Sequence, residues 1–160
     1  MLATTSAMTE RGELEAAART IIDANLYLTL ATADEAGRPW ASPVYYAPSD
    51  YRRFYWVSAP EATHSRNLAS RPEVGIVIFD SRAAIKTGQG VYMSAVAEEL
   101  TTHDLDRGIA IFSHRSQEHG AGEWTRADVV EPARLRLYRA TASDIFVLGE
   151  GNRRRPVRLG

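Results

Sequence analysis

Hydrophobic residues near the start of the chain recur first with the period of a helix and then with that of a strand. The spacing i, i+3, i+4, i+7, i+8 predicts an amphipathic helix. The positions that follow this spacing are Leu14, Ala17, Ala18, Ile21 and Ile22. Residues 1–8 before them are expected to form a flexible lead. From Leu26 to Ala31, leucines alternate with other residues, which predicts a half-buried strand.

Two more strands are expected over residues 40–47 and 53–57, joined by turns at 34–37 and 48–50. Pro43 cannot donate a ladder hydrogen bond, so its strand should lie at an edge or carry a bulge. Because the connections are short, we expect a mainly antiparallel sheet.

The second half of the chain continues with helices and strands. A short helix stopped by Pro72 precedes residues 74–79, whose unbroken apolar run predicts a strand buried on both faces. The remaining expectations are a loop over 80–89, a strand over 91–100, a helix over 101–114, a loop over 115–133, and strands near 135–140 and 145–148.

This order of elements favours a mainly β, α+β fold in which helices flank a β-barrel, because helices do not alternate with single strands. A chain of 160 residues suits one domain. We place that domain at residues 9–150, followed by an arginine-rich tail over 151–160. The tail is expected either to be solvated or to cross to an anion in a dimer.

Composition narrows the class of protein. The net charge is −1 and cysteine is absent, so we expect no nucleic-acid partner, no disulfide and no thiolate chemistry. No secretory signal and no apolar run of membrane-spanning length is apparent, which predicts a cytoplasmic protein without a membrane partner. Lys86 is the only lysine. Any anion site must therefore use arginine, histidine, hydroxyls or backbone amides.

Several well-known motifs are missing. The sequence contains no P-loop, no HExxH and no GxSxG, and the glycines at 88 and 90 lead into a strand rather than a helix. His114 and His119 are five residues apart, a poor spacing for metal ligation, and are expected to be plain surface residues. We therefore predict no metal site and no side-chain catalytic residue.

The segment from Ser58 to Leu68 has two interpretations. Ser58 and Glu61 match a capping box with Pro60 in the first turn, which would simply start a helix. Alternatively, side chains at the helix start converge on a phosphate, because a helix N-terminus presents unpaired N–H groups and partial positive charge. Those side chains are Thr63, His64, Ser65 and Arg66. Both interpretations can hold together.

Gln89 lies between two glycines, which suits either a simple turn or the close approach of a ligand ring to its amide. Aromatic residues on neighbouring strands are expected to be mostly core or interface, with a few touching a ligand. They are Tyr45, Tyr46, Tyr55, Trp56 and Tyr92.

The order and spacing of several short segments over residues 12–148 resemble the pyridoxamine 5′-phosphate oxidase-like superfamily of FMN-binding split β-barrels. These segments are Leu30-Ala31-Thr32, Gly37-Arg38-Pro39, Ser42-Pro43-Val44, Phe54-Tyr55-Trp56-Val57-Ser58, His64 to Val74, Gly88-Gln89-Gly90-Val91-Tyr92 and Ala97-Glu98-Glu99. The resemblance implies a six-stranded antiparallel split β-barrel flanked by helices. It also implies a homodimer with two flavin sites at its interface.

The resemblance also implies which residues bind the cofactor. The isoalloxazine ring would be lined, largely by backbone groups, by Ser42, Val44, Tyr45, Trp56, Val57 and Ser58. The helix start would hold the phosphate through Thr63, His64, Ser65, Arg66 and Asn67. Gln89 and Trp124 would lie near the ring or form its wall in the partner subunit.

The sequence departs from this family at the helix start. Many relatives carry an Arg-Lys pair where this chain has Thr63-His64. Less positive charge is therefore available, so Arg66 or a remote arginine would compensate. Binding would also be pH-sensitive, because an unperturbed histidine titrates near pH ~6.5. The basic residues that bind the substrate phosphate in true pyridoxamine phosphate oxidases have no match, which argues against a vitamin B6 substrate.

Four functions are compatible with these observations. The leading hypothesis is an FMN-dependent oxidoreductase that moves a hydride between flavin and a small organic substrate, or to oxygen. A deazaflavin-dependent reductase is the alternative within that class. A non-catalytic flavin-binding or stress-response protein, and a dimeric interaction module with an empty pocket, are the alternatives outside it.

Overall fold

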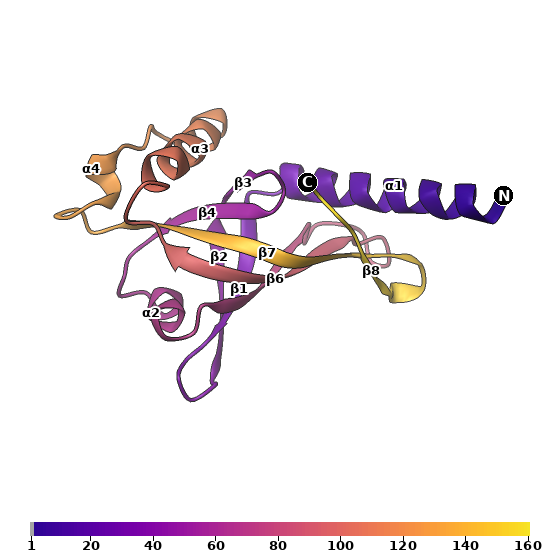
Figure 1. The fold of residues 1–160 in the computed structure, drawn as a ribbon, viewed down its shortest axis with the longest axis horizontal. Coiled ribbons are helices and arrows are strands. Elements are labelled where there is room, and N and C mark those ends of the chain that lie inside the picture. The colour runs from indigo at the N-terminus through magenta and orange to yellow at the C-terminus, as the bar shows by residue number, and fades with distance from the viewer. Residues whose placement is uncertain (1) are drawn as a thin grey trace.

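The computed structural model describes residues 2–160, in which an antiparallel sheet curls into a half-barrel with helices around it (Figure 1). The elements are α1 (Leu2–Ala24), β1 (Tyr27–Ala33), β2 (Pro39–Tyr45), β3 (Ala47–Ser49), β4 (Arg53–Ser58), α2 (Thr63–Ser70), β5 (Glu73–Phe79), β6 (Gly90–Glu99), α3 (Leu105–Glu118), α4 (Arg126–Val129), β7 (Arg136–Leu148), a 3-10 turn (Glu150–Asn152) and β8 (Arg154–Pro156). The predicted mainly β, α+β fold is confirmed.

The strands lie in the order β2-β1-β5-β6-β7-β4-β3, and β8 pairs with β7. Every pairing is antiparallel. Six strands have six residues or more, whereas β3 and β8 have three each. Six long strands therefore form the half-barrel. Pro43 lies in β2 at one edge of the sheet, as expected.

The two last predicted strands are one continuous strand, β7. Ser94 pairs with Asp144 and Ala95 pairs with Ala142, which leaves Ser143 as the extra residue of a bulge. The Ser143 hydroxyl donates to the Ser94 carbonyl at 3.1 Å. The polar Ser143-Asp144 pair is therefore a kink in a strand rather than the turn between two strands.

Helix α1 closes one side of the half-barrel with the apolar stripe that its sequence predicts. Ala18 and Ile22 are fully buried, and Leu14 and Ile21 pack beside them. The Tyr46 hydroxyl donates to the carbonyl of Ile22. Met1 lies outside the described residues, and residues 2–8, which we expected as a lead, fall within the bounds of α1. Among the described residues, no helix combines the length and the apolarity needed to cross a bilayer.

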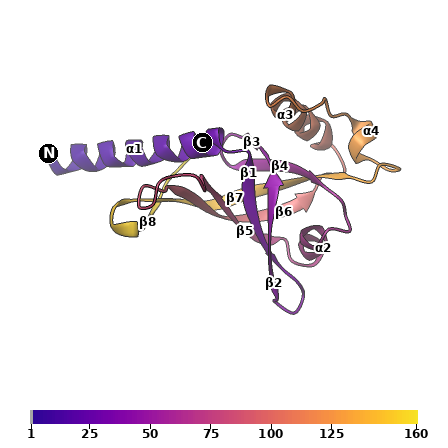
Figure 2. The ribbon, with the colours of Figure 1, turned by 180° about the vertical axis from the view of Figure 1, so that it is seen from behind.

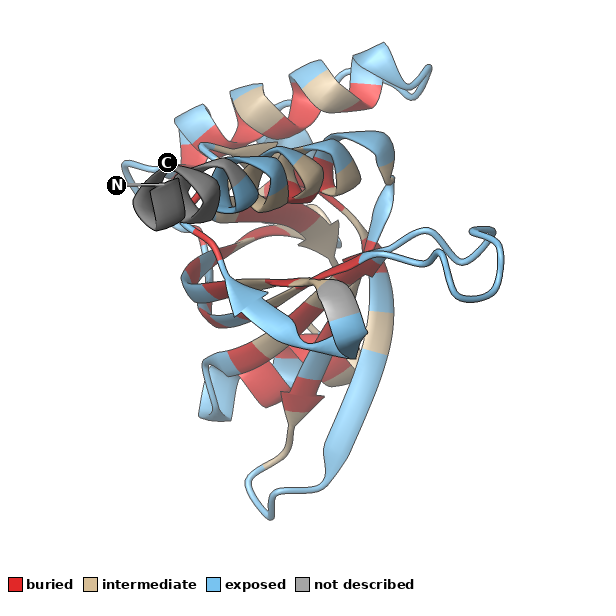
Figure 3. Ribbon diagram, turned by 90° about the vertical axis from the view of Figure 1, so that its right-hand side faces the viewer, coloured by how far each residue is buried: buried red, intermediate tan, exposed pale blue. Residues whose placement is uncertain are grey.

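Two apolar clusters hold the molecule together. The larger fills the inner face of the curled sheet, where buried residues concentrate (Figure 3). The smaller lies between the sheet and α3, at the end of the molecule that also carries α4 (Figure 2). Its buried members include Tyr55, Leu105, Ile109, Phe112 and Leu137. Helix α3 ends four residues later than predicted, and α4 occupies part of the expected loop 115–133.

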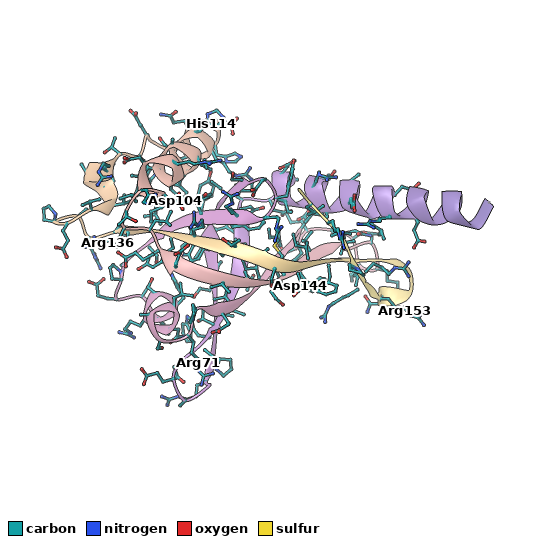
Figure 4. All side chains as sticks on the ribbon, viewed as in Figure 1. Arg71, Asp104, His114, Arg136, Asp144 and Arg153 are labelled. Atoms are coloured by element: carbon teal, nitrogen blue, oxygen red, sulfur yellow. The ribbon has the colours of Figure 1, made fainter. Side chains whose placement is uncertain are left out.

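The C-terminal segment packs onto the domain. Strand β8 pairs with β7, and the side chains of Val157 and Leu159 are 6% and 1% exposed. This segment is therefore not a solvated tail. Arg155 forms an ion pair with Glu10 at 3.1 Å. Arg153 lies beside β8, at the end of the sheet opposite to Arg136 and α2 (Figure 4).

Candidate functional site

A cleft of about 500 Å³ opens where the ends of β2 and β4 meet α2, α3 and the segment after α3. Its lining residues are Leu26, Tyr27, Pro43, Val44, Tyr45, Val57, Ser58, His64, Phe112, Ser116, His119, Ala121, Trp124 and Leu135. No lysine, arginine or carboxylate lines it among the described residues. The cleft therefore suits a ligand with a large uncharged surface.

Aromatic rings form one wall of the cleft. Tyr45 and Trp124 each meet Phe112 edge to face, with ring centroids 5.7 and 5.4 Å apart. Two serines of α3 fix the indole. The Trp124 backbone N–H donates to Ser113 Oγ at 2.9 Å, and Trp124 Nε1 donates to Ser116 Oγ at 3.2 Å. Two hydrogen bonds therefore hold Trp124 in this wall.

Tyr45 and His119 form the polar contact within this wall. The Tyr45 hydroxyl and His119 Nδ1 are 2.8 Å apart. Burial is the main cause that raises the pKa of Tyr45, so the phenol stays protonated over a wide pH range. His119 is exposed, as predicted, but it also lines the cleft and contacts Tyr45, which the prediction did not foresee. The predicted helix ended at residue 114, so His119 was placed in a loop. Helical periodicity therefore could not indicate which way its side chain points.

A second polar chain runs from β2 through α2 to β4. His64 Nε2 is 2.8 Å from Ser58 Oγ, and His64 Nδ1 is 3.2 Å from Ser42 Oγ. Trp40 Nε1 donates to the same Ser42 Oγ at 2.9 Å. Both ring nitrogens of His64 are thus occupied by hydroxyl groups. Three predicted site residues, Ser42, Ser58 and His64, form one hydrogen-bonded unit.

His64 supplies little positive charge at neutral pH. Its side chain is buried, and burial lowers its pKa below the ordinary value of 6.5. Among the described residues, the ring's hydrogen-bond partners are hydroxyl groups and not carboxylates, so no neighbouring negative charge opposes this effect. The imidazole is therefore neutral near pH 7 and acts through hydrogen bonds.

No side chain caps the start of α2, whose N-cap residue is Ala62. The first-turn N–H groups, which have no acceptor within a helix, therefore have no capping partner either. The predicted capping box at Ser58 and Glu61 was wrong, because Ser58 lies in β4 and contacts His64 instead. Ser65 Oγ is buried without a hydrogen-bond partner. Tyr138 lies near it but makes no hydrogen bond of regular geometry.

Four other predicted residues lie outside the cleft. Arg66 is exposed on α2, and Asn67 is buried, where its Nδ2 donates to Thr32 Oγ1 at 3.0 Å and ties α2 to β1. The Trp56 side chain points into the core and stacks on Tyr138. Gln89 is exposed in the loop before β6, at the opposite end of the sheet from α2 (Figures 1 and 2).

The structure thus brings together one part of the predicted set. Val44, Tyr45, Val57, Ser58, His64 and Trp124 line the cleft, and Ser42 supports it through His64. Thr63 and Ser65 lie at the adjoining helix start. Sequence reasoning missed Tyr27, Phe112 and His119. No cluster of three or more potential metal ligands occurs in the part of the chain that the structure describes.

Comparisons with known proteins agree with this architecture. A profile of the pyridoxamine 5′-phosphate oxidase family matches residues 14–148. A search of curated proteins finds no match. A heme binding protein from Mycobacterium smegmatis has a similar structure, with a TM-score of 0.68 and 24% identity; the alignment covers 88% of this chain but only 55% of that protein.

Two further solved structures are similar. The heme storage protein HutZ from Vibrio cholerae has a TM-score of 0.66 and 20% identity, with 84% of this chain and 94% of that chain covered. A FAD-binding protein from Mesorhizobium loti has a TM-score of 0.63 and 19% identity, with 81% and 87% covered. At these identities the likeness shows a common fold.

Proposed function

The chain belongs to the pyridoxamine 5′-phosphate oxidase family, and we propose that it is an FMN-dependent oxidoreductase acting on a small organic substrate. The observation that supports this proposal best is the juxtaposition of an uncharged aromatic cleft with the uncapped start of α2. FMN consists of a planar ring and an anionic tail. The cleft would hold the ring and the start of α2 would hold the tail, so the two must lie close together.

The residues present fit the two parts of FMN. The wall of Tyr45, Phe112 and Trp124 matches a planar ring system, and Ser58 adds a hydroxyl at its edge. Free N–H groups at the start of α2 and the unpartnered Ser65 hydroxyl match phosphate oxygens. These groups would hold FMN without a cation from the cleft lining.

Bound FMN supplies the hydride chemistry. The chain positions the ring and keeps water away from its face through the fixed Trp124 wall. Leu26 and Tyr27 in the cleft lining and Trp40 on β2 remain 42%, 59% and 50% exposed. We propose that a second copy of the chain covers these side chains, which makes a homodimer the functional unit.

A deazaflavin coenzyme is the alternative cofactor. Its longer anionic tail requires a basic groove, but no arginine or lysine lines the cleft among the described residues. The arginines around β8 lie at the far end of the sheet (Figure 4). FMN is therefore the better match.

Heme binding is a second candidate function, and His119 favours it. His119 lines the cleft, and in the form whose Nδ1–H donates to the Tyr45 hydroxyl oxygen, Nε2 carries no hydrogen and can ligate a metal. Ligating histidines usually donate their other ring N–H in this way. Two of the similar structures are heme proteins.

The first experiment is the absorption spectrum of the purified protein, before and after addition of FMN, with mass spectrometry of any released ligand. We expect the paired bands of oxidised flavin and the mass of FMN. A Soret band that is lost in His119→Ala would favour heme, whereas flavin binding should survive that variant. A colourless protein that does not bind FMN would refute the proposal. Turnover with a reductant separates an enzyme from a flavin-binding protein.

A further inference from the structure

Four side chains from three elements form one continuous hydrogen-bonded chain. It runs from Trp40 Nε1 through Ser42 Oγ and the His64 ring to Ser58 Oγ. Trp40 and Ser42 lie on β2, His64 on α2 and Ser58 at the end of β4. Ser58 and His64 line the cleft, whereas Trp40 does not. The hydrogen-bonded chain therefore connects Trp40 to the cleft.

We infer that this chain fixes His64 with its hydrogen on Nε2 and thereby turns the Ser58 hydroxyl into a donor aimed at the cleft. Trp40 and Ser42 are positioning residues in this arrangement. Each neutral form of the ring leaves one hydroxyl hydrogen without a partner among the described residues, so the assignment rests on which hydroxyl, Ser42 or Ser58, borders the cleft.

An indole N–H can only donate, so Ser42 Oγ accepts from Trp40. If Ser42 also donates to His64 Nδ1, its hydroxyl makes one bond of each kind. The neutral ring then carries its hydrogen on Nε2 and donates it to Ser58 Oγ. In the opposite arrangement Ser42 would accept twice, and the unpaired hydrogen would be the one on Ser42, which does not line the cleft.

The first arrangement leaves one hydrogen unpaired, and that hydrogen is on Ser58. Ser58 borders the cleft, where water or a ligand can accept it. The site therefore selects a ligand that presents an oxygen or nitrogen acceptor at this point and disfavours one that presents a donor. If the proposed function is correct, the acceptor is an oxygen of FMN, belonging either to a ring carbonyl or to the phosphate.

The position of the hydrogen can be measured without a cofactor. Nitrogen-15 NMR of the histidine rings near pH 8 distinguishes an Nε2–H from an Nδ1–H imidazole. We expect His64 to be the Nε2–H form. Ser42→Ala and Trp40→Phe should each raise the Nδ1–H fraction, whereas Trp124→Phe, which removes an indole N–H bonded to Ser116 instead, should leave it unchanged. An Nδ1–H ring in the unmodified protein would overturn the inference.

The donor role is tested by FMN titration followed by flavin fluorescence. Ser58→Ala should weaken FMN binding roughly three- to tenfold, the effect of one lost hydrogen bond, and Ser58→Thr should restore most of it. Loss for both FMN and riboflavin would place the acceptor on the ring, and loss for FMN alone would place it on the phosphate. Unchanged FMN affinity in Ser58→Ala would refute the donor role. If the unmodified protein binds no FMN, the proposed function fails, while the NMR result still decides the state of His64.

Discussion

The hydroxyl of Tyr45 and Nδ1 of His119 are 2.8 Å apart, although 74 residues separate them in the chain. Tyr45 ends β2, and His119 is the residue that caps the C-terminus of α3. Their rings also meet edge to face with centroids 5.9 Å apart. This pair joins the sheet to the end of α3 within the wall of the cleft.

The Tyr45–His119 pair should stabilise the docking of α3 by a small, measurable amount. We expect Tyr45→Phe and His119→Ala each to lower the free energy of unfolding by about 0.5–1 kcal/mol, because one partly exposed hydrogen bond is lost. The double variant should lose less than the sum of the two. Urea denaturation followed by tryptophan fluorescence measures all three. His114→Ala, which loses only an exposed contact to Glu118, is the control, and strict additivity would show that the pair does not interact.

Most of the fold could be predicted from local patterns in the sequence. The alternation around Leu28 and Leu30 and the apolar run over 74–79 each predicted a strand, and the structure confirms both strands. The prediction that the second is buried on both faces was wrong, because buried and half-buried positions alternate along β5 and Phe79 is 49% exposed. The sequence predicted two strands, near 135–140 and 145–148, where the structure has the single strand β7. Pairing with β6 makes Ser143 the extra residue of a bulge, and that pairing is not local.

The candidate site was less accessible to sequence reasoning for the same reason. Thr63, His64 and Ser65 could be found because they start one helix. His119 gains its place only when α3 docks on the sheet, and no local pattern encodes that contact. The Ser58-to-Glu61 spacing was ambiguous, because the hydroxyl that could cap a helix instead contacts His64.

His64 should make the stability of the protein depend on pH in the acid range. Burial lowers its pKa in the folded state below the ordinary value of 6.5, so the unfolded chain takes up a proton first as the pH falls. The contribution of His64 is therefore fully present above pH 6.5 and is lost as the pH falls through the lower folded value. Unfolding free energies measured from pH 8 to pH 5 should fall more steeply for the unmodified protein than for His64→Gln. His103→Gln, at an exposed position, should retain the original slope; equal slopes for all three proteins would contradict the neutral, buried state.

The buried bond from Asn67 to Thr32 should hold α2 in place. Thr32→Val keeps the shape of the side chain but leaves the Asn67 amide without its acceptor. We expect a loss of about 1–3 kcal/mol in the free energy of unfolding, the cost of an unsatisfied buried donor. Thr29→Val, on the outer face of the same strand, should change stability by less than about 0.5 kcal/mol. Similar values for the two variants would show that the bond is dispensable.

Trp56 should matter for stability and not for the ligand. It is fully buried, stacks on Tyr138 at a centroid distance of 5.7 Å, and its Nε1 has no hydrogen-bond partner. Trp56→Ala should cost about 3–5 kcal/mol, whereas Trp56→Phe should cost much less, because it keeps an aromatic ring and removes an unsatisfied donor. Calorimetry measures both. FMN affinity of Trp56→Phe should equal that of the unmodified protein, and a clear loss would mean that the indole reaches the cofactor.

Leu159 should behave as a core residue despite its place in the arginine-rich C-terminal segment. Its side chain is 1% exposed within the main apolar cluster, and Val157 beside it is also buried. Leu159→Ala should therefore lower the free energy of unfolding by about 2–4 kcal/mol, through lost transfer energy and the cavity that remains. Arg153→Ala, at an exposed position of the same segment, should change it by less than about 0.5 kcal/mol. Thermal denaturation of both variants and of the unmodified protein measures these changes in stability. If both variants melt with the unmodified protein, the segment is a solvated tail in solution and its packing against β7 contributes no stability.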